Sequence, residues 1–119
     1  MSNSPHKGKL AEDAAAHYLR ETGYQIIRRN ARLAGGELDI VAWEGEVLAF
    51  VEVKAGLSRD RRQCLEAIDQ RKVRRLSQAA AAFAAGLSCN CRFDVVTVDL
   101  AADPPACMLW RDAFRPEGD

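Results

Sequence analysis

Residues 35–54, GGELDIVAWEGEVLAFVEVK, constrain the fold more than any other part of the sequence. Two runs of apolar and β-branched residues flank the pair Gly45-Glu46, which is typical of two strands joined by a hairpin. A Gly-X pair suits a two-residue type II′ turn. That turn predicts a register in which Glu44 pairs with Val47 and the remaining residues follow outward from this pair.

The predicted register brings acidic side chains face to face. Asp39 would lie opposite Glu52, and Glu37 opposite Lys54. Directly opposed Cβ atoms are ~5 Å apart, so two carboxylates placed in this way need a compensating cation. Mg²⁺ takes oxygen ligands at about 2.1 Å and is typically held by one or two carboxylates plus substrate phosphate. We therefore expect Mg²⁺, or Mn²⁺, to bind at Asp39 and Glu52.

Lys54 adds a cationic group to this pair. It shares the face of Glu52, because strand side chains alternate with a period of two. Two metal-binding acids with a lysine two residues further on are typical of phosphodiester cleavage, in which a metal activates water and the lysine stabilises negative charge. The alternative is a surface hairpin in which Glu37 and Lys54 form an ion pair of little energetic value. A three-residue loop would also shift the register and separate Asp39 from Glu52.

Six blocks of the sequence carry a further signal. They are 8–19 (GKLAEDAAAHYL), 23–32 (GYQIIRRNAR), 36–42 (GELDIVA), 50–54 (FVEVK), 72–83 and 92–98 (RFDVVTV). In this order they resemble the small YraN-like bacterial family of presumed endonucleases, which is related to archaeal Holliday-junction resolvases. Asp39, Glu52 and Lys54 are similar to the signature of the wider nuclease superfamily, which is an Asp followed after a spacer by Glu-x-Lys.

The resemblance implies a fold and an activity. The fold would be a single α/β domain of the restriction-endonuclease-like kind, with a mixed central sheet flanked by helices. The activity would be metal-dependent hydrolysis of DNA phosphodiester bonds, with branched or structured DNA as a candidate substrate and a homodimer as a candidate assembly. Glu12 would match an acid contributed by the first helix, Asp39 and Glu52 would be metal ligands, and Lys54 would be the catalytic lysine.

Two departures from the family pattern leave an alternative open. The family continues Lys-Thr-Arg where this chain has Lys54-Ala55-Gly56, and it has Gly-Glu where this chain has Ala11-Glu12. The first change removes a hydroxyl and a guanidinium that can contact phosphate. The alternative is therefore a catalytically impaired module that keeps the fold and binds nucleic acid or protein.

Basic residues surround the candidate site in the sequence. From Lys54 to Arg75 there are eight Lys or Arg residues against three acids, a local balance of +5 (8 − 3) and the strongest electrostatic footprint for nucleic acid in the chain. Candidate phosphate contacts are Arg28, Arg32, Arg59, Arg61, Arg62 and Lys72. The alternative is a set of solvated basic surfaces. The formal net charge of zero argues against a protein that coats DNA non-specifically.

The remaining organisation follows from local signals. We expect a loose tail over residues 1–7 and one domain over residues 8–119. The pattern predicts a helix from Gly8 that stops at Gly23, a strand over 24–29, a loop over 30–36, a helix from the N-cap Asp69 to about Ala85, and strands over 92–100 and 107–110. Residues 111–119 are expected to be a ragged end.

The cysteines and the hydropathy of the chain bear on metal binding, on cellular location and on membrane insertion. The four cysteines form no Cys-x-x-Cys pair, so a zinc site is not expected. We find no secretion signal, which predicts reduced thiols and a cytoplasmic location. No apolar run approaches the ~20 residues that a membrane-spanning helix needs.

Overall fold

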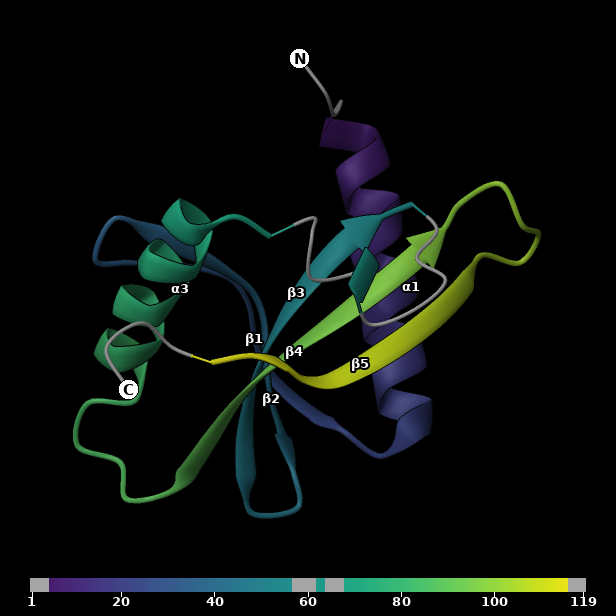
Figure 1. The fold of residues 1–119 in the computed structure, drawn as a ribbon. Helices are drawn as coiled ribbons and strands as arrows, with labels where there is room; N and C mark the ends of the chain where they lie inside the picture. Colours follow the sequence, from purple (N-terminus) through teal and green to yellow (C-terminus); the bar gives the residue numbers. More distant parts are fainter. Residues whose placement is uncertain (1–4, 57–61, 64–67, 116–119) are drawn as a thin grey trace.

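The computed structural model describes residues 5–56, 62–63 and 68–115. In this part of the chain, five strands form one sheet in the order β1-β2-β3-β4-β5 (Figure 1). The strands are β1 (Gln25–Leu33), β2 (Gly36–Glu44), β3 (Val47–Ala55), β4 (Asn90–Asp99) and β5 (Ala106–Phe114). β3 and β4 are parallel, whereas the other neighbours are antiparallel. The prediction of a mixed central sheet is confirmed.

Helices α1 (Pro5–Thr22) and α3 (Gln70–Phe83) cover opposite faces of the sheet. Ile40 packs in a cluster with Ala15 and Leu19 of α1. The next residue, Val41, packs in a separate cluster with Leu76 of α3. Because successive strand residues point to opposite faces, the two helices lie on opposite sides of the sheet. Figure 1 shows α3 beside β1 and β2, and α1 behind β3 and β4.

The helix ends follow local rules. α1 begins at Pro5, three residues before the expected start at Gly8, and proline suits the first helical position. It ends at Thr22, and the positive φ of 109° at Gly23 allows Tyr24 N–H to donate to Leu19 C=O at 2.9 Å. Asp69 caps α3 by accepting a 2.9 Å hydrogen bond from Lys72 N–H, as predicted.

The central hairpin has the predicted register. Glu44 pairs with Val47, and the ladder continues inward through Val41 and Phe50 to Ile40 and Val51. Gly45 has φ of 60°, and Glu46 is not among the described residues with positive φ. This combination is that of a type II′ turn. The two-residue loop is therefore confirmed, and the three-residue alternative is excluded.

Two expectations about strand length are wrong. The stretch 30–36 is not a loop, because β1 continues to Leu33 and turns through Ala34-Gly35 into β2. Both turn residues have positive φ, 51° and 81°, so a two-residue type I′ hairpin takes the place of a longer loop. β5 runs to Phe114, whose ring stacks on that of Phe93 at 4.8 Å. This packing holds residues 111–114 in the sheet, although they were expected to be ragged, and residues 116–119 lie outside the described part of the chain.

A buried polar network surrounds Asp94, which is fully buried. Its carboxylate accepts hydrogen bonds from Tyr24 Oη at 2.7 Å, Arg92 Nε at 2.8 Å and Asp112 N–H at 2.9 Å. Arg92 also pairs with Glu44, which in turn binds Arg111. These contacts join the start of β1 to β2, β4 and β5, so this acid is structural. None of the helices in the described residues is long and apolar enough to cross a bilayer.

Candidate functional site

The site is built where the pairing of β2 with β3 ends. Asp39 and Glu52 come directly after the last ladder pair, Ile40 with Val51. The carboxylate of Asp39 accepts a 2.9 Å hydrogen bond from the backbone N–H of Val53. Glu52 is only 5% exposed. The ladder stops one pair short of the predicted Asp39–Glu52 pair, and both residues line the same two clefts at this end of the strands.

The backbone is irregular at the same point. Leu38 packs with the α3 cluster and Ile40 with the α1 cluster, although residues two apart in a regular strand share a face. On β1, Asn30 has φ of 56° and lies between the paired residues Arg29 and Ala31. The regular alternation of side chains along β2 is therefore interrupted at Asp39, between Leu38 and Ile40.

The two acids are electrostatically coupled. Burial, followed by the negative charge of Glu52, raises the pKa of Asp39 to about 8. The hydrogen bond from Val53 and the positive charge of Lys72 act in the opposite direction. Concentrating two carboxylates in a buried position is unfavourable without a cation. The pair is thus suited to a positively charged partner.

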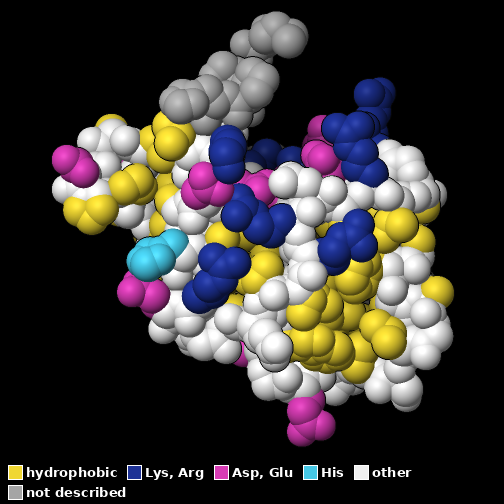
Figure 2. Space-filling view, turned by 180° about the vertical axis from the view of Figure 1, so that it is seen from behind, with side chains coloured by type: hydrophobic (Ala, Val, Ile, Leu, Met, Phe, Trp, Pro, Cys, Tyr) yellow, Lys and Arg dark blue, Asp and Glu magenta, His cyan; other side chains and the backbone are white. Residues whose placement is uncertain are grey.

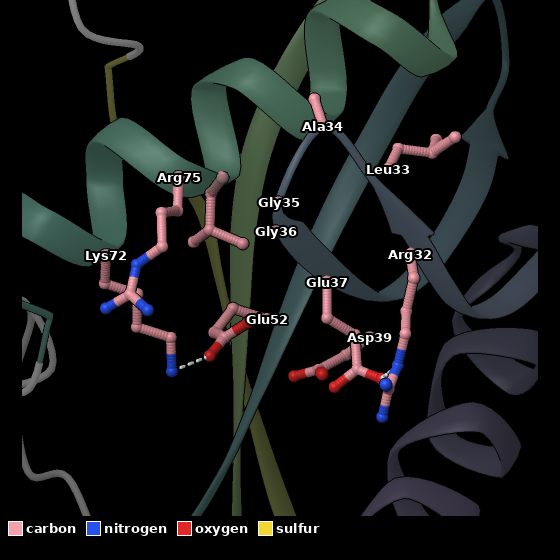
Figure 3. Close-up of a pocket in the computed structure, with 11 residues that line it drawn as sticks. Arg32, Leu33, Ala34, Gly35, Gly36, Glu37, Asp39, Glu52, Lys72 and Arg75 are labelled. Carbon is pink, nitrogen blue, oxygen red and sulfur yellow. Dashed lines mark hydrogen bonds and ion pairs between the residues drawn. The ribbon is translucent and has the colours of Figure 1, made fainter.

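Lys72 supplies one such partner from α3. Its Nζ forms an ion pair with Oε2 of Glu52, drawn as a dashed line in Figure 3. Burial lowers the pKa of Lys72, but the charge and hydrogen bond of Glu52, together with smaller contributions from Lys54 and Asp39, raise the pKa above its ordinary value. Lys72 lies one turn into α3, so the Asp69 cap at the start of the helix also fixes its position.

Lys54 lies at the same site. Burial lowers the pKa of its ammonium group, and the positive charge of Lys72 lowers it further, whereas Glu52 and Asp39 raise it. Two ammonium groups therefore accompany two carboxylates. A partly buried lysine close to acids can stabilise negative charge that develops on a phosphate.

Two clefts meet at the carboxylates. One, of about 690 Å³, lies between α3 and the turn that joins β1 to β2 (Figure 3). The other, of about 910 Å³, is bounded by α1, β1 and β3. Both are lined by Arg32, Glu37, Asp39, Glu52 and Lys72. The acids thus lie in the middle of a longer groove, open to a chain-like ligand on either side.

Close packing of β2 against α3 shapes the smaller cleft. A Cβ added to Gly36 would lie 2.6 Å from the carbonyl oxygen of Arg75 and 3.3 Å from Cβ of Ala79. Only glycine fits this approach. The contact brings the helix that carries Lys72 against the strand that carries Asp39.

Glu12 lines the larger cleft with Asp39 and Glu52, but it is bound by other groups. Its Oε1 accepts hydrogen bonds from Arg29 Nη2 at 2.7 Å and Asn30 Nδ2 at 3.0 Å. Among the described residues, no group of three or more His, Cys, Asp or Glu side chains is placed to hold a metal. The candidate metal set is therefore the two-carboxylate one.

The basic residues predicted from the sequence to contact phosphate differ in whether they line the two clefts. Arg32 lines both clefts and pairs with Glu37 at 3.3 Å, and the β2–β3 ladder stops before the predicted Glu37–Lys54 pair. Arg28 lies over the ring of Phe83, 6.0 Å from its centroid, and lines neither cleft. Arg62 is exposed. Arg59 and Arg61 lie outside the described residues.

Two further basic residues lie at the site, Arg75 and Arg29, and the sequence places Arg29 in one basic cluster with Arg28 and Arg32. Arg75 lines the smaller cleft, and Figure 3 shows it beside Lys72 on α3. Its position three residues after Lys72, on the same helix face, was the available signal. Arg29 binds Glu12 and Asp13 and lines the larger cleft. A chain pattern gives no sign of this pairing, because it depends on how α1 docks on β1.

The donor set fits a hard divalent cation. Mg²⁺ is commonly held by one or two carboxylates, with substrate phosphate and water completing its shell. Asp39 and Glu52 offer two carboxylates, and their placement already calls for positive charge, which Lys72 provides in this structure. The residues present therefore fit such an ion.

The fold and the site together define a small α/β protein with a nuclease-like fold, in which paired acids and lysines lie in one groove. The chain belongs to the family described as "Uncharacterised protein family UPF0102", whose model matches residues 11–98. This is the YraN-like family that the sequence blocks resemble.

Relatives extend the match to most of the chain. A UPF0102 protein of Symbiobacterium thermophilum is 42% identical over 112 residues, covering 91% of this chain and 95% of its own. A UPF0102 protein of Magnetococcus marinus is also 42% identical over 112 residues, covering 91% and 90%. One from Chlorobium chlorochromatii is 43% identical over 97 residues, covering 80% and 75%.

Proposed function

We propose that this protein is a metal-dependent endonuclease that hydrolyses DNA phosphodiester bonds. The observation that carries the proposal is the pair of half-buried Asp39 and buried Glu52, with Lys54 and Lys72 beside it in a groove. Carboxylates that hold a divalent ion, together with lysines that face the substrate, form a phosphodiester-cleaving arrangement. The sequence signature and the position of these residues support the same reaction.

Each residue has a role in the proposed reaction. Asp39 and Glu52 hold Mg²⁺ or Mn²⁺, which when bound supplies charge neutralisation and an activated water for attack on phosphorus. Lys54 stabilises the negative charge that develops on the phosphate oxygens. Glu12, held by Arg29, assists from α1.

Basic side chains around the groove support binding to a phosphate backbone. Arg32 and Lys72 line the groove directly. The sequence-based set of candidate phosphate contacts also contains Arg28, Arg59, Arg61 and Arg62. Figure 2 shows a mixed surface, with Lys and Arg side chains grouped around Asp and Glu side chains above an apolar area. Such local patches allow DNA binding despite a formal net charge of zero.

The shape of the groove favours cleavage within a strand. Because the two clefts extend from the acids in different directions, a continuous strand can pass through the site. Branched or structured DNA is the proposed substrate class, on the basis of the family resemblance. A homodimer is the proposed assembly, since a four-way junction presents two equivalent strands.

The proposal is tested by cleavage assays with Mg²⁺ or Mn²⁺ on plasmid, single-stranded and four-way junction DNA. Wild-type protein should cleave at least one substrate, and Asp39→Ala should lose both cleavage and metal binding while keeping the fold. Arg71→Met is a matched control, because Arg71 is exposed on α3 and lines neither cleft. Equal behaviour of wild type and Asp39→Ala on all three substrates would overturn the proposal.

A second candidate is a nucleic-acid-binding or protein-interaction module without the reaction. Ala55-Gly56 favours it, because these residues cannot supply the hydroxyl and guanidinium that the family pattern places after the lysine. DNA binding that needs no metal, with a salt dependence unchanged in Asp39→Ala, would support this candidate over the first.

A further inference from the structure

Lys72 occupies an unusual position for a phosphate-binding residue, because it points at an acid. Its ammonium group contacts Glu52, whose side chain is 6% exposed, while the side chain of Lys72 is itself 35% exposed. It also acts electrostatically on Asp39. The lysine therefore serves both carboxylates of the candidate metal site from a helix that follows the strand carrying Glu52.

When both acids are ionised, their charges and those of the two neighbouring lysines balance without a metal. Asp39 and Glu52 carry two negative charges when ionised, and Lys54 and Lys72 carry two positive charges. Adding a divalent ion while all four side chains stay in place would leave an excess of two positive charges in a partly buried site. Such an excess is costly where solvent screening is weak. One cation must then move away, and the long stem and partial exposure of Lys72 make it the group that can do so.

We propose that Lys72 is a built-in counterion, which occupies the carboxylate pair in the metal-free protein and is displaced by the divalent ion. This inference rests on the proposed metal site at Asp39 and Glu52. Displacement releases the ammonium group into the groove that both clefts share. Lys72 is then available to a substrate phosphate only in the metal-loaded protein, so that metal binding and DNA binding strengthen each other.

Thermal unfolding of Lys72→Met tests the proposal without any activity measurement. The experiment is run at about pH 9, where a proton does not replace the missing ammonium group on the carboxylates. Without metal, Lys72→Met should unfold at least about 5 °C below wild type, because a buried carboxylate has lost its partner. With excess Mg²⁺, this gap should close to about 1 °C, since the ion replaces the lysine.

Matched measurements separate the possible outcomes. Arg71→Met, on the same helix, should unfold like wild type in both conditions, and NaCl at the same ionic strength should not close the gap. If Lys72→Met is unfolded without metal, circular dichroism should show Mg²⁺ restoring its helix content, and failure to restore it would overturn the proposal. An equal gap with and without Mg²⁺, or no gap in the metal-free protein, would also overturn it.

The failure of the proposed function has a different signature. If the metal site itself is absent, Mg²⁺ will shift the unfolding temperature of neither protein. In that case the metal-free gap persists as an ordinary ion-pair effect, and the metal-dependent function and this inference both fall. A Mg²⁺ shift of equal size in both proteins keeps the metal site and removes only the counterion role of Lys72.

Discussion

The carboxylate of Asp39 accepts a 2.9 Å hydrogen bond from the backbone N–H of Val53, one residue beyond Glu52 on the neighbouring strand. This bond takes over where the main-chain ladder between β2 and β3 stops, at Ile40 and Val51. The acid is thus both a sheet element and the centre of the candidate site. Because a backbone N–H group holds the carboxylate, the side chain of Asp39 is fixed before any ligand binds, as a preorganised site requires.

Asp39→Asn should change how stability depends on pH. The folded protein raises the pKa of Asp39 from 3.8 to about 8, chiefly by burial. The folded state therefore binds this proton more tightly than the unfolded state, and wild-type stability falls as pH rises from about 4 to about 8. The amide cannot ionise and still accepts the hydrogen bond from Val53. In the presence of a chelator, denaturant unfolding should show the variant more stable than wild type at about pH 9 and similar at about pH 4; parallel curves would contradict this.

Lys54→Met should separate activity from stability. Removing the ammonium group takes away charge stabilisation at the phosphate, so cleavage should fall by roughly 10² to 10³-fold. The unfolding temperature should stay equal or rise, because burial lowers the pKa of Lys54 and thus disfavours the charged form. Lys9→Met is the control, since Lys9 lines the larger cleft but pairs with Asp13 on the exposed side of α1. A variant that cleaves like wild type would exclude a catalytic role for Lys54.

Gly36→Ala should loosen α3 from β2. The new methyl group would lie 2.6 Å from the carbonyl oxygen of Arg75, so that the helix must shift, at a cost of about 1–3 kcal/mol in the free energy of unfolding. Gly8→Ala is a matched control, because nothing lies within 4 Å of its added methyl group on exposed α1. The control should be neutral or stabilising by about 0.5–1 kcal/mol. Equal stabilities of the two variants in urea titrations would show that the close contact is absent in solution.

Glu44→Gln should weaken the protein at neutral pH but not in acid. Hydrogen bonds from Arg111, reinforced by those from Arg92, lower the pKa of Glu44 to about 2. A lowered carboxyl pKa stabilises the fold above the ordinary value of 4.5 and loses that contribution as pH falls toward 2. The unfolding temperatures of wild type and variant should therefore differ at pH 7 and converge as the pH approaches 2. Glu46→Gln, in the exposed turn beside it, serves as the control, and a constant difference across this range would contradict the prediction.

Local rules in the sequence determined the central hairpin and the meeting of two acids. Gly45 supplies the positive φ of the turn, and the two-residue loop then sets every pair outward to Ile40 and Val51. The Asp69 cap was equally local, since it depends on a hydrogen bond within three residues. The prediction of a loop over residues 30–36 was wrong. Glycine-rich residues suit both a loop and a tight hairpin turn, and only the pairing of β1 with β2 selects between them.

The tertiary structure alone decided which cation meets the two acids and which group binds Glu12. Lys72 reaches Glu52 because α3 docks closely on β2 at Gly36, and Glu12 turns to Arg29 because α1 crosses β1. Arg28 lies over Phe83, a contact between β1 and α3 that the sequence does not show. Turn type and strand alternation act over a few residues and can be read along the chain. Helix docking is set by the packing of side chains distant in sequence, which no local pattern encodes.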